Sequence, residues 1–152
     1  MKNLTKQEIV ALLRNLQDGV IALSDGSRPY CIPVGYIYIN DTVYFSILPT
    51  GRKWGCFQNS PWICFNIFSW NASRTEWSSV IIDGEMRQVT DLEEIESVVR
   101  GNIAKMGLDP TAYLKKRMDY YRRTIDSPKG VKIFKILAAE TGGKRMRSTM
   151  GS

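Results

Sequence analysis

Histidine is absent from this chain: none of its 152 residues is a histidine. That absence excludes a Ser-His-Asp triad, a Cys-His pair, a histidine-ligated zinc site and a haem held by a proximal histidine. If the protein is an enzyme, its chemistry has to come from carboxylates, amines, thiols, tyrosines or a bound cofactor.

Cysteine is scarce as well. The three cysteines, Cys31, Cys56 and Cys64, are odd in number and form no CxxC pair. This pattern argues against a disulfide framework and against a cysteine-rich metal site, and it is typical of a reducing cytoplasm. Cys31 and Cys64 stand in apolar segments, which indicates buried side chains. We therefore expect no metal ion.

Long hydrophobic segments are also missing. No stretch approaches the roughly 20 apolar residues of a membrane span, and residues 1–8 lack the apolar core of a signal peptide. We therefore expect a cytoplasmic protein that makes no contact with a membrane. Residues 142–144 match only part of a phosphate-binding loop, and no pair of carboxylates is placed for acid–base catalysis.

The composition is that of a folded, basic protein. Hydrophobic residues make up 43% and charged residues 24%, and 21 Lys and Arg against 15 Asp and Glu give a net charge of +6. A basic balance favours an anionic partner. The densest basic stretch, residues 115–123, is interrupted by Asp119, so we favour a solvated helix face over a nucleic-acid surface. The length predicts one domain, over residues 1–141, followed by a polar basic tail, residues 142–152.

The hydrophobic pattern predicts six strands and several helices. Helices are expected after the capping box at Thr5 and Glu8, over residues 52–59, and after Asp91 and Asp109. Closing short antiparallel strands into a barrel removes their exposed edges. We therefore predict a mainly β fold with flanking helices, a six-stranded antiparallel barrel. The β-branched and aromatic segments expected to form its strands are residues 20–24, 30–39, 42–47, 62–70, 77–90 and 131–141.

Residues 44–53 are the most informative segment for function. A strand ends there, a glycine-containing loop follows, and a helix begins with Arg52 and Lys53. Such a helix start offers free N–H groups and a positive dipole end to a phosphate, and Ser46 and Thr50 would add hydroxyl donors. Two cations in a first turn oppose the helix dipole, which indicates a site. A solvated surface turn explains the same residues equally well.

Four segments gain meaning from their order and spacing. They are YFS at residues 44–46, GRK at 51–53, QNSPWICF at 58–65 and SSVIIDGEMR at 78–87. Together they resemble the pyridoxamine 5′-phosphate oxidase-like family of FMN-binding split β-barrels. The proline-centred segment at residues 30–34 is similar to the nitroimidazole-resistance branch. The resemblance implies a split barrel and a homodimer with FMN at the subunit interface.

The resemblance also implies which residues hold FMN. Residues 45–46 match positions near the ribityl chain and phosphate, residues 52–53 match the basic pair on the phosphate, and residues 33–36 match the strand along the flavin edge. Ser79 matches a polar residue five positions before the strand glycine. With the loop residues included, the predicted cofactor-binding set is Pro33, Val34, Gly35, Tyr36, Phe45, Ser46, Thr50, Gly51, Arg52, Lys53 and Ser79.

The resemblance has departures that bear on the substrate. The oxidase itself carries a second-strand lysine where this chain has Gly35 and Tyr36, and both branches carry a histidine that is absent here. We therefore expect FMN-dependent transfer of hydride or electrons to a different small-molecule acceptor. The catalytic residue is unknown, and Tyr36 is the first proton donor to test. The alternatives are the deazaflavin F420 in the same slot, or a non-catalytic barrel that binds nucleic acid.

Overall fold

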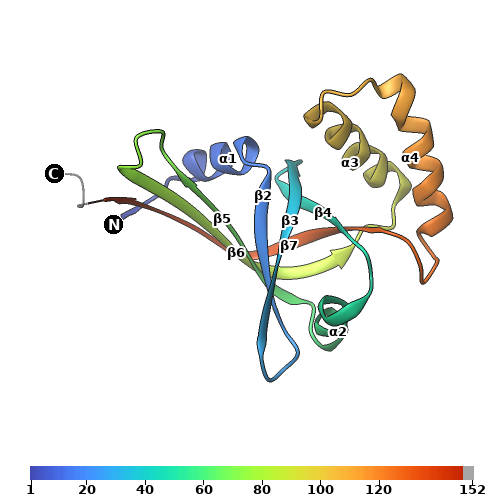
Figure 1. The fold of residues 1–152 in the computed structure, drawn as a ribbon, viewed down its shortest axis with the longest axis horizontal. Helices are drawn as coiled ribbons and strands as arrows, with labels where there is room; N and C mark the ends of the chain where they lie inside the picture. Colours follow the sequence, from blue (N-terminus) through green and yellow to red (C-terminus); the bar gives the residue numbers. More distant parts are fainter. Residues whose placement is uncertain (149–152) are drawn as a thin grey trace.

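The computed structural model describes residues 1–148, and six antiparallel strands form a closed ring at its centre (Figure 1). The order around the ring is β2, β3, β4, β7, β6, β5 and back to β2. This closure confirms the predicted mainly β fold and the six-stranded barrel. The six strands are β2 (Asp18–Ser24), β3 (Pro29–Ile39), β4 (Thr42–Ile47), β5 (Trp62–Trp70), β6 (Glu76–Gln88) and β7 (Lys132–Arg147).

β7 has different neighbours along its two halves. One of its edges pairs with β6 over most of its length, from Gln88 opposite Phe134 to Glu76 opposite Arg147. The other edge pairs with β4 at residues 132–135 and with a short seventh strand, β1 (Lys2–Asn3), at residues 144–145. Between these ladders β7 pairs only with β6 within residues 1–148, which makes this a split barrel.

The polar tail predicted from residue 142 begins later than the sequence indicates. Residues 142–147 continue β7, because β6 is long enough to pair with all of them. Gly143 also has to be small, since a Cβ there would lie 2.8 Å from Leu4 Cδ1. The last part of the predicted tail, residues 149–152, lies outside the described residues.

A bulge predicted at residues 83–84 is confirmed. The register between β6 and β7 shifts between Asp83 and Gly84. A Cβ on Gly84 would come within 2.3 Å of the Leu137 carbonyl oxygen, so only glycine allows the two strands to approach this closely.

Four helices flank the barrel, and each start agrees with its sequence signal. The Thr5 hydroxyl accepts a hydrogen bond from the Glu8 N–H at 3.2 Å, and the Glu8 carboxylate accepts one from the Thr5 N–H at 3.0 Å. Asp91 and Asp109 cap the two later helices. Residues 18–19, expected to stop the first helix, instead begin β2. The helices are α1 (Lys6–Asn15), α2 (Gly51–Asn59), α3 (Leu92–Lys105) and α4 (Pro110–Thr124).

None of the helices in residues 1–148 combines the length and the apolar character that a membrane span requires.

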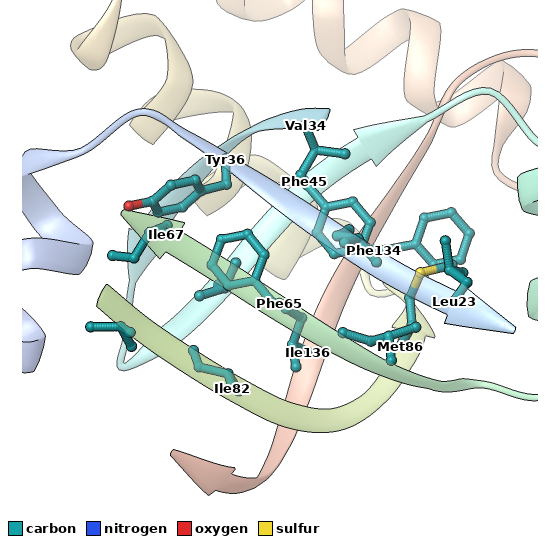
Figure 2. Packing of buried hydrophobic residues seen from close by; sticks show 14 of the residues in the cluster. Leu23, Val34, Tyr36, Phe45, Phe65, Ile67, Ile82, Met86, Phe134 and Ile136 are labelled. Atoms are coloured by element: carbon teal, nitrogen blue, oxygen red, sulfur yellow. The ribbon is translucent and has the colours of Figure 1, made fainter. Parts of the chain in front are cut away.

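Two hydrophobic clusters hold the fold together. The first fills the barrel and centres on Phe65 and Phe134, both fully buried (Figure 2). Helix α2 covers the barrel near Phe134, with the rings of Trp54 and Phe57 at 6.2 and 5.4 Å from it. The second cluster lies between α3, α4 and the outward side chains of β3, β4 and β7, such as Ile37. The barrel wall is therefore covered by helices on one side.

A polar contact fixes α3 to this wall. The Glu94 carboxylate of α3 accepts hydrogen bonds from the Tyr44 hydroxyl at 2.7 Å and the Lys135 ammonium at 2.9 Å. Burial alone would raise the pKa of Glu94, but these two donors offset it and hold the pKa below its ordinary value. Burial and the Glu94 contact raise the pKa of Tyr44 to about 12. The contact fixes the first turn of α3 over the sheet.

Candidate functional site

A hollow of about 370 Å³ lies where β2, β3 and β4 meet the C-terminal end of α3. Four of the eleven predicted cofactor-binding residues line it: Gly35, Tyr36, Phe45 and Ser46. They come from two adjacent strands, because Tyr36 pairs with Phe45 in the ladder between β3 and β4. The structure therefore brings together two segments that the sequence separates by nine positions or more.

The strand alternation explains why this place is open. Tyr36 and Phe45 are buried in the barrel, whereas their neighbours Gly35 and Ser46 are exposed. A Cβ on Gly35 would have Asp18 Oδ1, at 3.8 Å, as its nearest neighbour, and Asp18 also lines the hollow. A larger side chain at position 35 would fill the space, so glycine keeps the hollow available to a ligand.

Tyr36 is a poor proton donor, although it lines the hollow. Its hydroxyl donates a hydrogen bond to the Leu13 carbonyl at 2.8 Å, within the barrel core (Figure 2). Burial raises the pKa of Tyr36 well above its ordinary value, with a smaller contribution from the charge of Asp18. The hydroxyl is thus committed to a structural contact.

Polar residues that the sequence did not indicate line the rest of the hollow. Gln17 lies just before β2 and Asp18 begins it, and Asn102 and Lys105 come from the last turn of α3. In the sequence, a lysine in the last turn of a helix is already explained by the helix dipole, and Asp18 is explained by the predicted turn, so neither residue indicated a site. Only the fold, which places α3 over β3 and β4, shows that these residues face one space.

The start of α2 is open to a ligand. Its N-cap residue, Thr50, makes no side-chain capping bond, and the first turn contains no acidic residue. Gly51 has a φ of +74°, a left-handed conformation that favours glycine. The free N–H groups of this nine-residue helix therefore remain available to an anion.

The two cations of this turn differ in their contacts. The Arg52 guanidinium lies 4.4 Å from the centre of the Tyr30 ring. It also contributes to the lowered pKa of Asp25, about 2, for which hydrogen bonds from the N–H groups of Arg28 and Ser27 are the main cause. The Lys53 ammonium makes no hydrogen bond or ion pair within residues 1–148. A phosphate at this turn can therefore bind the Lys53 ammonium without displacing another contact.

Of the seven predicted residues that do not line the hollow, four lie at the start of α2 and three lie elsewhere. Val34 points into the barrel, and Pro33 is exposed on the outer face of β3. Ser79 lies on β6, where its hydroxyl accepts a hydrogen bond from the Asn66 amide at 2.8 Å. One chain therefore does not bring all the predicted residues into a single site.

An apolar face adjoins the hollow on the outside of the barrel. Five large apolar side chains of β2, β5, β6 and β7 are 36–57% exposed there. Phe68 packs against Trp70 and Trp77, with ring centres 6.1 and 5.6 Å apart. The strand pairings put all five on the outward side of the sheet, with the side chains of Asp83 and Glu85 among them. Exposed apolar side chains gathered on one face of a sheet are typical of an interaction surface. The five residues, called the outer apolar face below, are Val20, Trp62, Phe68, Ile81 and Leu137.

Two further features of the described residues bear on which ligand the protein could bind. A hollow of about 590 Å³ separates α1 from the barrel, and its lining is mainly apolar, with Leu13 and Val43 among the contributors. No group of three or more His, Cys, Asp or Glu side chains in residues 1–148 is arranged to hold a metal ion. The 370 Å³ hollow is therefore the better candidate for a polar ligand.

Comparison with known proteins gives one family and several similar folds. Residues 5–131 match the family model of pyridoxamine 5′-phosphate oxidase. No curated protein matches the chain. Among solved structures, an FAD-binding protein from Mycobacterium smegmatis superposes with a TM-score of 0.68 at 18% identity, covering 97% of this chain and 100% of the other.

Two other solved structures show the same fold. An FAD-binding protein from Mesorhizobium loti gives a TM-score of 0.66 at 22% identity, covering 97% of this chain and 98% of the other. A candidate 5-nitroimidazole antibiotic resistance protein from Bacteroides thetaiotaomicron gives 0.68 at 21% identity, covering 95% and 87%. At these identities the likeness concerns the fold.

Proposed function

Because the chain belongs to the pyridoxamine 5′-phosphate oxidase family, we propose that it is a flavoprotein that binds FMN and passes hydride or electrons to a small-molecule acceptor. The proposal rests on one observation: β4, which lines the polar hollow, leads through a short loop to the open start of α2. The bound flavin supplies the redox chemistry, and the protein orients it and excludes water. The three free thiols fit a reducing cytoplasm.

The residues present suit the shape and charge of FMN. Ser46 lines the hollow, and Thr50, four positions later, lies at the start of α2. Four residues of fully extended chain cover at most about 14 Å, so the two places lie within that distance of each other. We propose that FMN, with its flat polar ring and phosphate tail, spans both places. The ring meets the donors of the hollow, and the phosphate meets the N–H groups of α2 and the Lys53 ammonium.

FAD is the second candidate, because two structurally similar proteins are described as FAD-binding. The experiment that decides is to denature the purified protein and identify the released ligand by chromatography and mass. We expect a yellow protein that releases FMN, and apoprotein that rebinds FMN. Release of FAD or of a deazaflavin would show that the protein binds that cofactor in place of FMN. A colourless protein that binds no flavin would overturn the proposal.

Replacing Lys53 with alanine is expected to weaken FMN binding about tenfold. A charge-assisted hydrogen bond contributes about 1.5–3 kcal/mol, and 1.4 kcal/mol corresponds to a factor of ten. Riboflavin lacks the phosphate, so its affinity is expected to stay within about a factor of two. Fluorescence titration of apoprotein with both ligands measures the difference.

The matched control for this comparison is Lys116→Ala, which removes an exposed lysine of α4. It is expected to change neither affinity. Equal losses for FMN and riboflavin in Lys53→Ala would show that the lysine supports the fold, and an unchanged FMN affinity would place the phosphate elsewhere.

We further propose that two copies pair through the outer apolar face, with a flavin site at each end of the interface. Burying the five side chains removes apolar surface from water, and a two-fold interface uses the same patch on both subunits. The face adjoins the hollow because Asp18, which lines the hollow, lies on the same strand as Val20. A partner would therefore cover the open side of the ring.

Replacing Phe68 with glutamate is expected to convert the dimer to monomers at micromolar concentration. The two-fold symmetry places one new carboxylate on each subunit, so the unfavourable free energy of burying an unpaired charge in the interface arises twice. Analytical ultracentrifugation measures the mass, and FMN titration of the monomeric variant is expected to show weakened binding. A wild-type protein that sediments as a monomer would contradict the pairing.

A further inference from the structure

We infer that Lys105 is a positioning residue that makes the hollow hold the reduced, negatively charged flavin more tightly than the oxidised one. This inference rests on the proposed flavin binding and adds a role that the sequence pattern did not indicate. It concerns the last residue of α3, which no part of the predicted site includes.

The Lys105 ammonium is held in place at the wall of the hollow. Its Nζ donates a hydrogen bond to the Tyr36 carbonyl and lies 3.5 Å from the Leu16 carbonyl. It also lies 4.9 Å from the centre of the Tyr36 ring, a cation–π distance. A flexible side chain anchored at these points presents its charge at a defined position beside β3.

The charge of Lys105 is not neutralised within the described residues. Burial lowers the pKa of Lys105, and attraction by Asp18 opposes that effect without forming an ion pair. An ammonium has three N–H donors, and the two carbonyls take two of them. One donor and a partly desolvated positive charge therefore remain for an anionic ligand in the hollow.

The chemistry of the surroundings orients a flavin ring. Gln17, Asn102 and Ser46 bring amide and hydroxyl groups to the hollow, and these suit the carbonyl and N–H groups of the pyrimidine end. The dimethylbenzene end is apolar and suits the outer apolar face next to the hollow. The ring thus binds with its pyrimidine end toward Lys105.

Reduction changes the charge at that end. Two electrons and one proton convert the neutral oxidised ring into a reduced ring with one negative charge, shared over the pyrimidine nitrogens and oxygens. A nearby ammonium stabilises this form and has little effect on the neutral form. The same two electrons and one proton enter the ring whichever reductant supplies them. Lys105 therefore changes the equilibrium between oxidised and reduced flavin, independently of the reductant.

The test compares the affinities of both redox forms in variants of the flavin-loaded protein. Lys105→Gln keeps a donor for the Tyr36 carbonyl and removes the charge, whereas Lys105→Arg keeps the charge. We expect Lys105→Gln to lower the ratio of reduced to oxidised FMN affinity about tenfold, which corresponds to about 30 mV in the midpoint potential of a two-electron couple. Lys105→Arg is expected to stay within about threefold.

Two further variants give the comparison its controls. Asp18→Asn removes a negative charge beside Lys105 and is expected to shift the same ratio in the opposite direction, so the inference does not depend on one variant folding. Lys53→Ala is expected to weaken both redox forms equally, because the phosphate is present in both. Dithionite titration followed by absorbance measures each potential, and thermal unfolding checks each fold.

The outcomes separate the two proposals. Wild-type protein that binds FMN, with potentials unmoved in Lys105→Gln and Asp18→Asn, would overturn the role of Lys105 and leave flavin binding intact. Equal loss of both redox forms in Lys105→Gln would make Lys105 an anchor for β3 only, and would also overturn the inference. Wild-type protein that binds no flavin would overturn the proposed function, and the inference with it.

Discussion

Replacing Phe134 with alanine is expected to lower the free energy of unfolding by about 4 kcal/mol, because truncating a buried phenylalanine removes its burial and leaves a cavity. Phe134 on β7 is fully buried and contacts rings from two other elements. Phe45 of β4 stacks on it at 6.1 Å, and Trp54 and Phe57 of α2 meet it edge-on at 6.2 and 5.4 Å. Figure 2 shows it beside Phe45 within the barrel.

Urea unfolding followed by circular dichroism measures this loss. Phe134→Leu keeps part of the volume and is expected to cost about half as much. Tyr113→Ala removes a partly exposed aromatic ring of α4, whose centre lies 5.7 Å from the Arg117 guanidinium, and is expected to change the stability by no more than about 1 kcal/mol. A Phe134→Ala protein within 1 kcal/mol of the wild type would show that this cluster does not couple α2 to the barrel.

The second large effect is expected at Lys132, a buried lysine where β7 begins. Only 6% of the residue is exposed. Its ammonium donates hydrogen bonds to the carbonyls of Thr124 and Ser127 and lies 3.5 Å from that of Lys129. It thus satisfies carbonyls that the end of α4 leaves unpaired and joins that helix to the sheet.

Lys132→Met keeps the length of the side chain and removes the ammonium. We expect a loss of about 3 kcal/mol, since hydrogen bonds to a charged group contribute about 1.5–3 kcal/mol and their carbonyl partners stay buried. For a chain of this size that is a fall of roughly 6–12 °C in Tm. Lys116→Met, on the exposed side of α4, is expected to leave Tm unchanged. Equal melting temperatures for the Lys132→Met protein and the wild type would contradict this role.

Much of the fold follows from local signals in the sequence. The capping box at Thr5 and the caps at Asp91 and Asp109 act within a few residues, so their positions agree with the structure. The end of β7 depends instead on the length of β6, a partner more than fifty residues earlier. The local pattern of residues 142–147 does not contain that information, so it predicts a tail where the structure has a strand.

The candidate site also combines residues that the local sequence places together with residues that only the fold brings in. Ser46, Thr50 and Lys53 follow one another on a strand, a loop and a helix start, so the sequence alone places them together. Lys105 and Asn102 reach the hollow because α3 packs on the sheet, through its apolar cluster along the helix and the Glu94 contacts in its first turn. Arg52 shows the opposite case, since its contact with Tyr30 arises from the packing of α2.

The two sets of neighbours along β7 bear on how the chain folds. Until β7 forms, β4 and β6 each present an unpaired edge, and residues 92–124 fold as helices between the fifth strand of the ring and the sixth. Pairing between Lys2 and Arg145 joins residues from opposite ends of the described chain. Contacts so distant in sequence form slowly and leave open edges free for wrong partners. Synthesis on the ribosome therefore completes this barrel last at β7, and that interval is when aggregation competes with folding.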